Sequence, residues 1–442
     1  MLELLRRHVH NKKVLLLGYG REGKSTLRLL KQAGGFAELA IADQAPLSGG
    51  ELEGITVYTG KDYQACLERY DIIFKSPGIV LEHPDESLLS RVTSQTELFL
   101  ERYRDQVIGV TGTKGKSTTA TLLFHALIQS GRPCVLAGNI GIPAFDTLSQ
   151  MTEDTTVVYE LSCHQLEYTR VSPHIALFLN LYEEHLDHYI TMERYAAAKR
   201  RIYQYQTGED CLICRADCAP DSYPGRLITF AQRGQADIRY DSDGFEWDGR
   251  RYILPAEEIS LVGEHNVANI AAAYAAAAQI GVRWEEFLPA LRTYRALPHR
   301  LQLVGEVDGV RYYDDSISTI CESAIQAMHS LSDIGSVLIG GMDRGIDYTP
   351  LEEYLCTAPV DHVILMYDTG KRIAEELRTR YPDQMRADRL HVVEDLAQAV
   401  ALAKQITRKG KRCLLSPAAA SYGFFTNFEE RGDVFQALVM EK

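Results

Sequence analysis

A run of small, hydroxyl-bearing and basic residues has the composition of a phosphate-binding loop. Residues 109–118 read Gly-Val-Thr-Gly-Thr-Lys-Gly-Lys-Ser-Thr. Glycines let backbone N–H groups approach a phosphate, a lysine neutralises its charge, and a hydroxyl can ligate Mg²⁺. We expect an apolar strand at 107–110 and a helix at 118–129, which is the order such a site requires. The sequence therefore predicts an ATP site at Gly112, Thr113, Lys114, Gly115, Lys116, Ser117 and Thr118.

The loop differs from the strict G-x-x-x-x-G-K-[ST] pattern at one position. Val110 stands where the first glycine is required, and the glycines present are Gly109 and Gly112. The alternative interpretation is a glycine-rich turn with an exposed lysine, and the flanking strand and helix argue against it. By itself the loop leaves kinase, ATPase and ligase chemistry open.

A second glycine-rich turn follows the first strand expected in the chain. Residues 13–17 are apolar after Lys13 and lead into Gly18-Tyr19-Gly20-Arg21-Glu22-Gly23, and a later strand ends at Asp43. This arrangement is typical of dinucleotide-binding turns, although many such turns need glycine only for packing. On its own, the turn favours a nicotinamide-dependent oxidoreductase.

The elements that must position these loops indicate an α/β protein of three domains. The chain has 442 residues, and a prior of roughly 150 residues per domain gives about three. We predict a Rossmann-like N-terminal domain (1–99), a central P-loop ATPase-type domain (100–298) and a C-terminal Rossmann-like α/β domain (299–442). In the last domain, strands expected at 336–339, 362–366 and 412–415 alternate with helical patterns.

Composition limits the partners. A net charge of −13 argues against a broad nucleic-acid or membrane surface, so small-molecule partners are expected. No apolar run approaches the roughly 20 residues needed to span a bilayer. The nine cysteines form no disulfide-like framework and the N-terminus has no signal-peptide pattern. We expect a cytoplasmic monomer.

Several potential metal ligands lie in the central region. Glu160 ends a strand expected at 157–159, where open α/β sheets place their ligands. Residues 183–188, Glu-Glu-His-Leu-Asp-His, are dense in ligand types, but such runs are often a solvated face. Cys211, Cys214 and Cys218 could suggest a metal site, and we favour a buried strand because no fourth ligand follows.

Further segments carry a resemblance to a known family. With the variant loop, they resemble the Mur ligase family along the whole chain. These segments are Gly138-Asn139-Ile140-Gly141, Glu160-Leu161-Ser162, Asn180 to His185, Leu297-Pro298-His299-Arg300, Ser416-Pro417 and the Asn-Phe-Glu-Glu-Arg-Gly run at 427–432. The resemblance implies that the first domain binds a UDP sugar, the second binds ATP, and the third closes over both.

The resemblance also implies roles for individual residues. The UDP-sugar residues would be Gly18, Tyr19, Gly20, Gly23, Asp43, Ser76, Asn139 and Ser162. Further ATP contacts would be Asn266, Asn269, Arg300 and Asp315. Glutamate would be bound by Arg344, Ser421 and Phe428. The catalytic residues would be Lys116, Glu160, His185 and Lys199. One Mg²⁺ would be held by Ser117 and Glu160, and another by Glu160, His185 and a carbamylated Lys199. Without the resemblance, Lys199 would be interpreted as an exposed helix lysine.

The implied reaction joins D-glutamate to UDP-N-acetylmuramoyl-L-alanine through an acyl phosphate, with ATP and Mg²⁺ as cofactors. Two departures fall where substrate recognition is expected: Ile317 replaces a lysine in Asp-Ser-Lys-Ala-Thr-Asn, and Gly423-Phe424 replaces Asp-Gln. A related ligase that adds L-glutamate or another amino acid therefore stays open. The oxidoreductase and a catalytically silent nucleotide-binding regulator stay open as well.

Overall fold

The computed structural model describes residues 1–82, 84–139, 142–184, 186–255, 257–261, 263–295, 298–382, 384–386 and 388–441. Their strands form three sheets, and the chain divides into two compact units. Unit 1 comprises Met1–Ile259 and Glu264–Tyr294, and unit 2 comprises Ser260–Gly263 and Arg295–Lys442. Among the described residues, no helix has the length and apolar character needed to cross a membrane.

The first sheet of unit 1 is wholly parallel, with strand order β3-β2-β1-β4-β5. Its middle strand is apolar and buried except for Lys13, because helices cover both faces of a parallel sheet. The strands are β1 (Lys13–Leu17), β2 (Glu38–Asp43), β3 (Thr56–Thr59), β4 (Ile72–Lys75) and β5 (Val92–Thr93), and the helices are α1 (Leu2–Val9), α2 (Arg21–Ala33), α3 (Glu86–Arg91) and α4 (Gln95–Tyr103).

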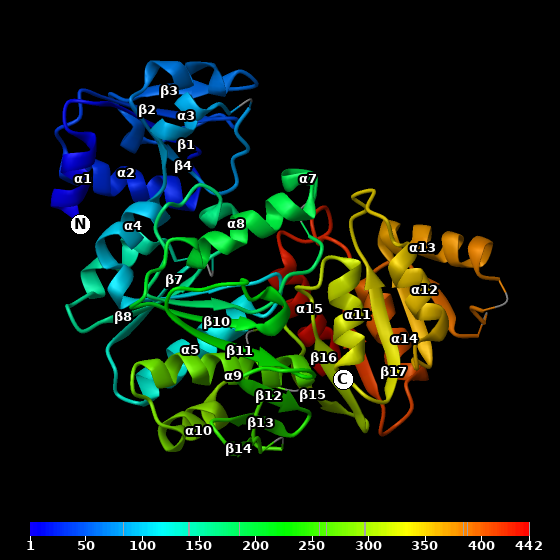
Figure 1. Ribbon diagram of the computed structural model, residues 1–442. Helices are drawn as coiled ribbons and strands as arrows, with labels where there is room; N and C mark the ends of the chain where they lie inside the picture. Colours follow the sequence, from blue (N-terminus) through cyan, green and yellow to red (C-terminus); the bar gives the residue numbers. More distant parts are fainter. Residues whose placement is uncertain are drawn as a thin grey trace. The chain divides into compact units, whose positions relative to one another are not determined.

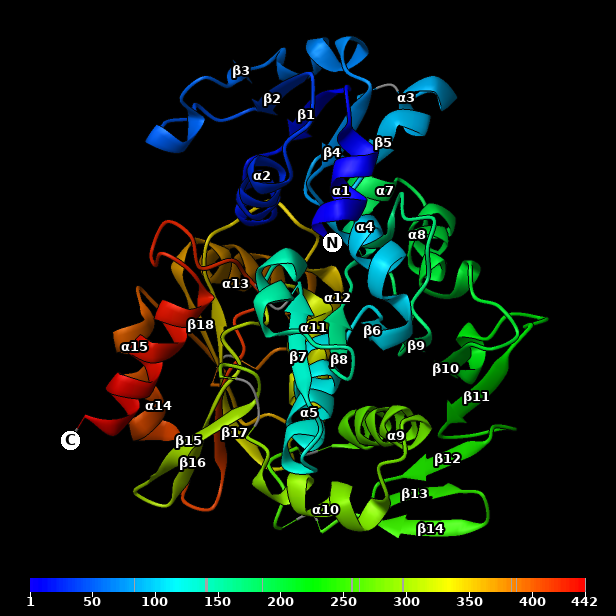
Figure 2. The same ribbon diagram turned by 90° about the vertical axis from the view of Figure 1, so that its left-hand side faces the viewer.

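The second sheet of unit 1 has the order β14-β13-β12-β11-β10-β9-β6-β8-β7, parallel from β7 to β12 and antiparallel beyond. Helices α5 and α9 lie on one face and α8 on the other (Figure 1 and Figure 2). The strands are β6 (Val107–Thr111), β7 (Cys134–Gly138), β8 (Thr156–Glu160), β9 (Ile175–Phe178), β10 (Cys211–Arg215), β11 (Arg226–Ala231), β12 (Ile238–Asp241), β13 (Gly244–Trp247) and β14 (Arg250–Ile253). The helices are α5 (Lys116–Gln129), α6 (Cys163–Leu166), α7 (Leu186–Tyr189), α8 (Met192–Gln204), α9 (Glu264–Gln279) and α10 (Trp284–Thr293).

Unit 2 contains the third sheet, with order β15-β16-β20-β17-β18-β19. One buried cluster joins it to α11, α12 and α13, and another joins its opposite face to α14 and α15. The strands are β15 (Gln302–Val307), β16 (Val310–Asp314), β17 (Ile334–Gly340), β18 (His362–Met366), β19 (Leu390–Val393) and β20 (Arg412–Leu415), and the helices are α11 (Cys321–His329), α12 (Thr349–Thr357), α13 (Tyr367–Arg380), α14 (Leu396–Ile406) and α15 (Phe428–Met440).

The α/β class with three parallel-type sheets confirms the predicted fold class. One helix begins earlier than its sequence pattern indicates: α5 starts at Lys116 rather than 118. The two additional residues, Lys116 and Ser117, are polar and mask the apolar periodicity. Cys211 and Cys214 are buried in β10, as expected for small apolar side chains.

Asp210, at the start of β10, is a buried carboxylate that joins three segments of the central sheet. It accepts hydrogen bonds from Arg104 Nη2 at 2.6 Å, His174 Nδ1 at 2.8 Å and Thr207 N at 2.6 Å. Burial alone would raise the pKa of Asp210, but these donors outweigh it and hold the pKa below its usual value.

We predict that Asp210→Asn destabilises the chain by about 3 kcal/mol, because Arg104 loses its buried anionic partner. A depressed pKa stabilises the fold above the unfolded-state value, so the wild-type advantage should be full at neutral pH and disappear as the pH falls below about 4. Urea unfolding of both chains between neutral and acid pH measures this difference, with the exposed Asp154→Asn as control. A constant difference at all pH values would contradict the assignment.

Candidate functional site

The predicted phosphate loop connects β6 to α5 and depends on two glycines. Gly112 and Gly115 have φ values of +155° and +83°, which L side chains rarely adopt. A Cβ on Gly115 would lie 2.4 Å from Asn269 Oδ1 of α9. The loop is therefore pressed against α9, where Asn269 Nδ2 also donates to Asn266 Oδ1 at 3.2 Å. The structure brings both predicted asparagines to the loop.

Lys116 folds back onto its own loop. Its Nζ donates to Gly112 O at 3.0 Å and to Thr113 O at 2.9 Å. Burial lowers the pKa of Lys116, and the nearby carboxylates of Glu160 and Glu184 oppose this shift. The ammonium group is thus held at the loop by neutral carbonyls, which phosphate oxygens can replace as stronger acceptors.

Lys199 reaches the same carbonyl from α8. Its side chain is 1% exposed, its Nζ donates to Gly112 O at 2.7 Å, and the Tyr195 ring centroid lies 4.8 Å away. Burial lowers the pKa of Lys199 to about 7, and the charge of Lys116 adds to this shift. The exposed helix lysine considered as an alternative is therefore wrong. Near neutral pH a large part of this amine is unprotonated, which makes it nucleophilic.

Glu160 presents a buried carboxylate whose charge acts on Lys116. Its Oε1 accepts a hydrogen bond from Asn139 Nδ2 at 2.9 Å. Its Oε2 is buried and has no hydrogen-bond partner within the described part of the chain. An unsatisfied buried carboxylate oxygen is costly, and a hard cation such as Mg²⁺ would satisfy it. The donor set therefore fits the predicted metal, with the Ser117 hydroxyl in the first turn of α5.

His185, Ile140, Gly141 and Leu297 lie outside the described residues. The segment before His185 is attached to the loop: Lys114 Nζ pairs with Glu184 Oε1 at 2.8 Å, and Asn180 Oδ1 accepts from Lys114 N at 2.8 Å. Among the described residues, no three His, Cys, Asp or Glu side chains are arranged to hold a metal. Asn180 was not predicted as a site residue, although its place just after β9 marked the sheet edge.

The first-sheet turn is held by residues from two later strands. Ser76 Oγ donates to Gly18 O at 2.9 Å, and a Cβ on Gly23 would lie 2.2 Å from the same oxygen. Tyr19 N donates to Asp43 Oδ2 at 2.7 Å. The structure thus brings together the UDP-sugar residues predicted in this domain. The carboxylate of Asp43 accepts a hydrogen bond from a backbone N–H of the turn.

Short helix α6 connects that turn to the end of β8. Ser162 caps α6, and its N–H donates to Gln165 Oε1 at 3.0 Å. Gln165 Nε2 in turn donates to Glu22 Oε1 of α2 at 2.6 Å. Asn139 N donates to Glu160 O at 2.9 Å, so Asn139 and Ser162 both lie at the carboxyl edge of the central sheet.

In unit 2, the predicted residues Asp315, Arg344 and Ser421 occupy loops at the carboxyl ends of strands, whereas Arg300 precedes β15 and Phe428 begins α15. Asp315 is buried and accepts from Ser416 Oγ at 2.8 Å and Leu301 N at 3.2 Å, and burial raises its pKa to about 7. Nearby Arg300 is among the charges that oppose this shift. Arg344 Nη2 donates to Thr319 O at 3.2 Å, which joins the loop after β17 to the loop after β16.

A buried arginine that was not predicted stabilises these loops. Arg431 of α15 is fully buried and donates to Ser316 O at 2.7 Å and Ala419 O at 3.0 Å. Ser316 Oγ donates to Phe428 O at 2.8 Å, and Ser421 lies two residues after Ala419. Phe428 therefore belongs to this network, and Ser421 adjoins it in the sequence. The run at 427–432 contained this arginine, but sequence alone did not show that it is buried.

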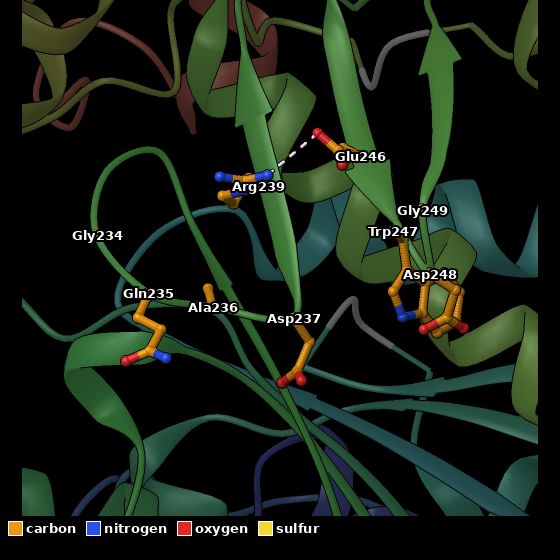
Figure 3. Close-up of a pocket in the computed structure, with 9 residues that line it drawn as sticks. All are labelled: Gly234, Gln235, Ala236, Asp237, Arg239, Glu246, Trp247, Asp248 and Gly249. Atoms are coloured by element: carbon orange, nitrogen blue, oxygen red, sulfur yellow. Dashed lines mark hydrogen bonds and ion pairs between the residues drawn. The ribbon is translucent and has the colours of Figure 1, made fainter.

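A surface hollow of about 390 Å³ lies at the β12–β13 hairpin (Figure 3). Its lining includes Arg239, which pairs with Glu246 at 3.3 Å, and Asp237, whose Oδ2 accepts from Thr229 N at 2.7 Å. None of the predicted site residues lines it.

Comparison with known proteins agrees with this arrangement. The Mur ligase middle domain pattern matches residues 110–277, and the Mur ligase, glutamate ligase domain pattern matches residues 299–419. The chain is 34% identical over 449 residues to the UDP-N-acetylmuramoylalanine–D-glutamate ligase of Geobacillus kaustophilus, covering 97% of each chain. It is also 34% identical over 445 residues to the enzyme of that name from Latilactobacillus sakei, covering 96% of each.

Solved structures share the fold. The MurF ligase of Thermotoga maritima in complex with ADP matches with a TM-score of 0.60 at 16% identity, covering 99% of each chain. MurC, the UDP-N-acetylmuramate-alanine ligase of the same organism, matches with a TM-score of 0.58 at 19% identity, covering 96% of this chain and 98% of that one. With two domain patterns and full-length relatives in agreement, the chain belongs to the Mur ligase family and is a ligase.

Proposed function

We propose that the protein ligates D-glutamate to UDP-N-acetylmuramoyl-L-alanine at the expense of ATP, through an acyl phosphate. One observation carries the proposal: the buried Lys199 and the partly buried Lys116 both donate to Gly112 O, and the carboxylate of Glu160, whose charge acts on Lys116, has a buried oxygen with no hydrogen-bond partner among the described residues. This site concentrates positive charge where a triphosphate would lie. The names of the full-length relatives supply the substrates.

The proposed reaction has two chemical steps. An oxygen of the L-alanyl carboxylate attacks the γ-phosphorus, and ADP leaves with the electron pair of the broken P–O bond. The glutamate amine then attacks the acyl carbon, phosphate leaves, and the amine loses a proton. Lys116 and the loop N–H groups bind and orient the phosphates, so positioning and charge neutralisation provide the rate.

We assign the remaining polar groups of the site to metal binding. Mg²⁺, when bound, supplies charge neutralisation to the phosphates. Ser117 and Glu160 would hold one ion, and Glu160, His185 and the carbamate of Lys199 would hold another. Carbamate formation fits the buried amine, because an unprotonated Lys199 Nζ adds CO₂, releases a proton and becomes an anionic oxygen ligand.

The substrates occupy separate parts of the chain in this proposal. The turn at Gly18–Gly23, with Asp43 and Ser76, would bind the UDP moiety through helix N-terminal N–H groups. Asn139 and Ser162 would line the path of the sugar nucleotide towards Glu160. Asn266, Asn269, Arg300 and Asp315 would contact the nucleotide of ATP, and Arg344, Ser421 and Phe428 would bind glutamate.

A second acceptor, L-glutamate, stays open because two departures from the family pattern fall near the predicted glutamate residues. Position 317 lacks the lysine that the family resemblance implies, and the segment after Ser421 carries apolar side chains. Phe424 stacks on Tyr367 with ring centroids 4.1 Å apart, and Tyr422 is 60% exposed. These changes alter the surroundings of the predicted glutamate residues. Family membership, by contrast, argues against the oxidoreductase and the silent regulator.

An acceptor panel separates the two ligases. We expect ADP release with UDP-N-acetylmuramoyl-L-alanine and D-glutamate, and none when either is omitted. Parallel assays use L-glutamate, D-aspartate and L-aspartate at equal concentration, with product identity checked by mass spectrometry. Turnover with L-glutamate alone would overturn the D-glutamate assignment while leaving the ligase mechanism intact.

Lys199 provides a pH-dependent test. Because only the unprotonated amine adds CO₂ and its pKa is about 7, a ¹³C-carbamate NMR signal should be strong at pH 8 and decline as the pH falls through 7. Lys199→Ala should lack the signal and lose about 100-fold or more in kcat as a metal ligand is lost, with partial rescue by a short carboxylate. The neighbouring Arg200→Ala should behave as wild type. Unchanged activity of Lys199→Ala would exclude the role.

A further inference from the structure

A buried ion pair connects the two sheets of unit 1. Lys75, the last residue of β4, has a side chain only 3% exposed, and its Nζ lies 3.7 Å from Glu167 Oε2. Glu167 directly follows α6 and is itself 17% exposed. The Tyr168 ring centroid lies 5.3 Å from the same ammonium group. Neither Lys75 nor Glu167 is among the predicted site residues.

On the side of the first sheet, Lys75 holds the turn that carries Ser76. Its Nζ lies 3.4 Å from Ser76 O and 3.4 Å from Pro77 O. Ser76 Oγ in turn donates to Gly18 O at 2.9 Å. The position of Lys75 therefore affects both loops that form the predicted UDP-sugar edge.

On the side of the central sheet, Glu167 contacts a histidine side chain. His188 Nε2 of α7 lies 3.2 Å from Glu167 Oε1 and 3.3 Å from Oε2. Helix α7 begins directly after His185, the predicted metal ligand. Glu167 thus joins the turn at Ser76 to α7, the helix that follows the predicted metal ligand in the sequence.

Burial of a charged pair costs desolvation free energy, which favours a role for this pair other than stabilising the fold. Burial lowers the pKa of Lys75, and the charges of Glu167 and Glu22 oppose that shift. Apolar residues of similar size often stabilise a fold as well as a buried pair does, so such pairs are a poor source of stability alone. This pair instead provides directional contact to two backbone carbonyls and one histidine.

We propose that Lys75 and Glu167 are positioning residues that hold the Ser76 turn and α7 in the arrangement that binds the UDP-sugar substrate. The inference rests on the proposed function for the identity of that substrate. It does not require either side chain to touch the substrate, since both are largely covered. The loss of either partner should weaken the sugar nucleotide and leave the adenine nucleotide unaffected.

The test is calorimetric binding of UDP-N-acetylmuramoyl-L-alanine and of ADP to the full chain. Lys75→Met and Glu167→Gln should each weaken binding of the UDP sugar about tenfold, the size of effect found for residues that act on a site without touching its ligand, and should leave ADP affinity within about twofold. The double variant should also bind the UDP sugar about tenfold, rather than about 100-fold, less tightly than wild type, because both changes break the same interaction. Lys13→Met is the matched control, since Lys13 pairs with Glu38 at 3.6 Å on the same sheet but is 53% exposed.

Three results would overturn the inference: unchanged UDP-sugar affinity in both single variants, an equal loss of ADP affinity, or multiplicative losses in the double variant. Binding is measured without turnover, so a wild-type chain that binds the UDP sugar but fails to ligate would refute the proposed function alone. The isosteric Glu167→Gln keeps the test valid if Lys75→Met does not fold.

Discussion

The carbonyl oxygen of Gly112 organises the central site, because a buried and a partly buried lysine side chain both donate to it. Lys116 approaches from the loop itself and Lys199 from α8, and the charge of Lys116 opposes the protonation of Lys199. Two protonated amines at one neutral carbonyl repel each other, which favours the unprotonated form of the buried Lys199. The arrangement is therefore suited to anions: a triphosphate at Lys116 and a negatively charged modification at Lys199.

The fold explains how such a site can be built. The loops predicted to bind ligands in both sheets of unit 1 lie at the carboxyl ends of parallel strands, where helix N-termini add partial positive charge. Glycines occur where backbone segments approach each other, as at Gly115 against Asn269 and Gly23 against Gly18 O. In unit 2, Arg431 plays a comparable part by holding the loops after β16 and β20 from beneath. Rigid networks under the loops are what precise positioning of two reacting substrates requires.

Much of this was predictable from the sequence, and the exceptions have a common cause. The loop at 109–118 and Glu160 could be predicted because their residue types and spacing carry the chemistry locally. Lys75, Asn180 and Arg431 could not, because their importance comes from partners 92, 66 and 115 residues away in the chain. Lys199 is an intermediate case. Its sequence context, Lys-Arg-Arg, is typical of an exposed helix face, so only the family resemblance indicated a role for it. Its burial against Gly112 is a tertiary effect that no local pattern records.

Direct attack of the substrate carboxylate on ATP is the step on which the proposed mechanism depends most. If it occurs, UDP-N-acetylmuramoyl-L-alanine labelled with ¹⁸O in its alanyl carboxylate should transfer one ¹⁸O atom to inorganic phosphate in each turnover. Mass spectrometry or ³¹P NMR of the released phosphate detects this label. Ligation that releases phosphate without ¹⁸O would contradict the acyl phosphate, and with it the role proposed for the two lysines.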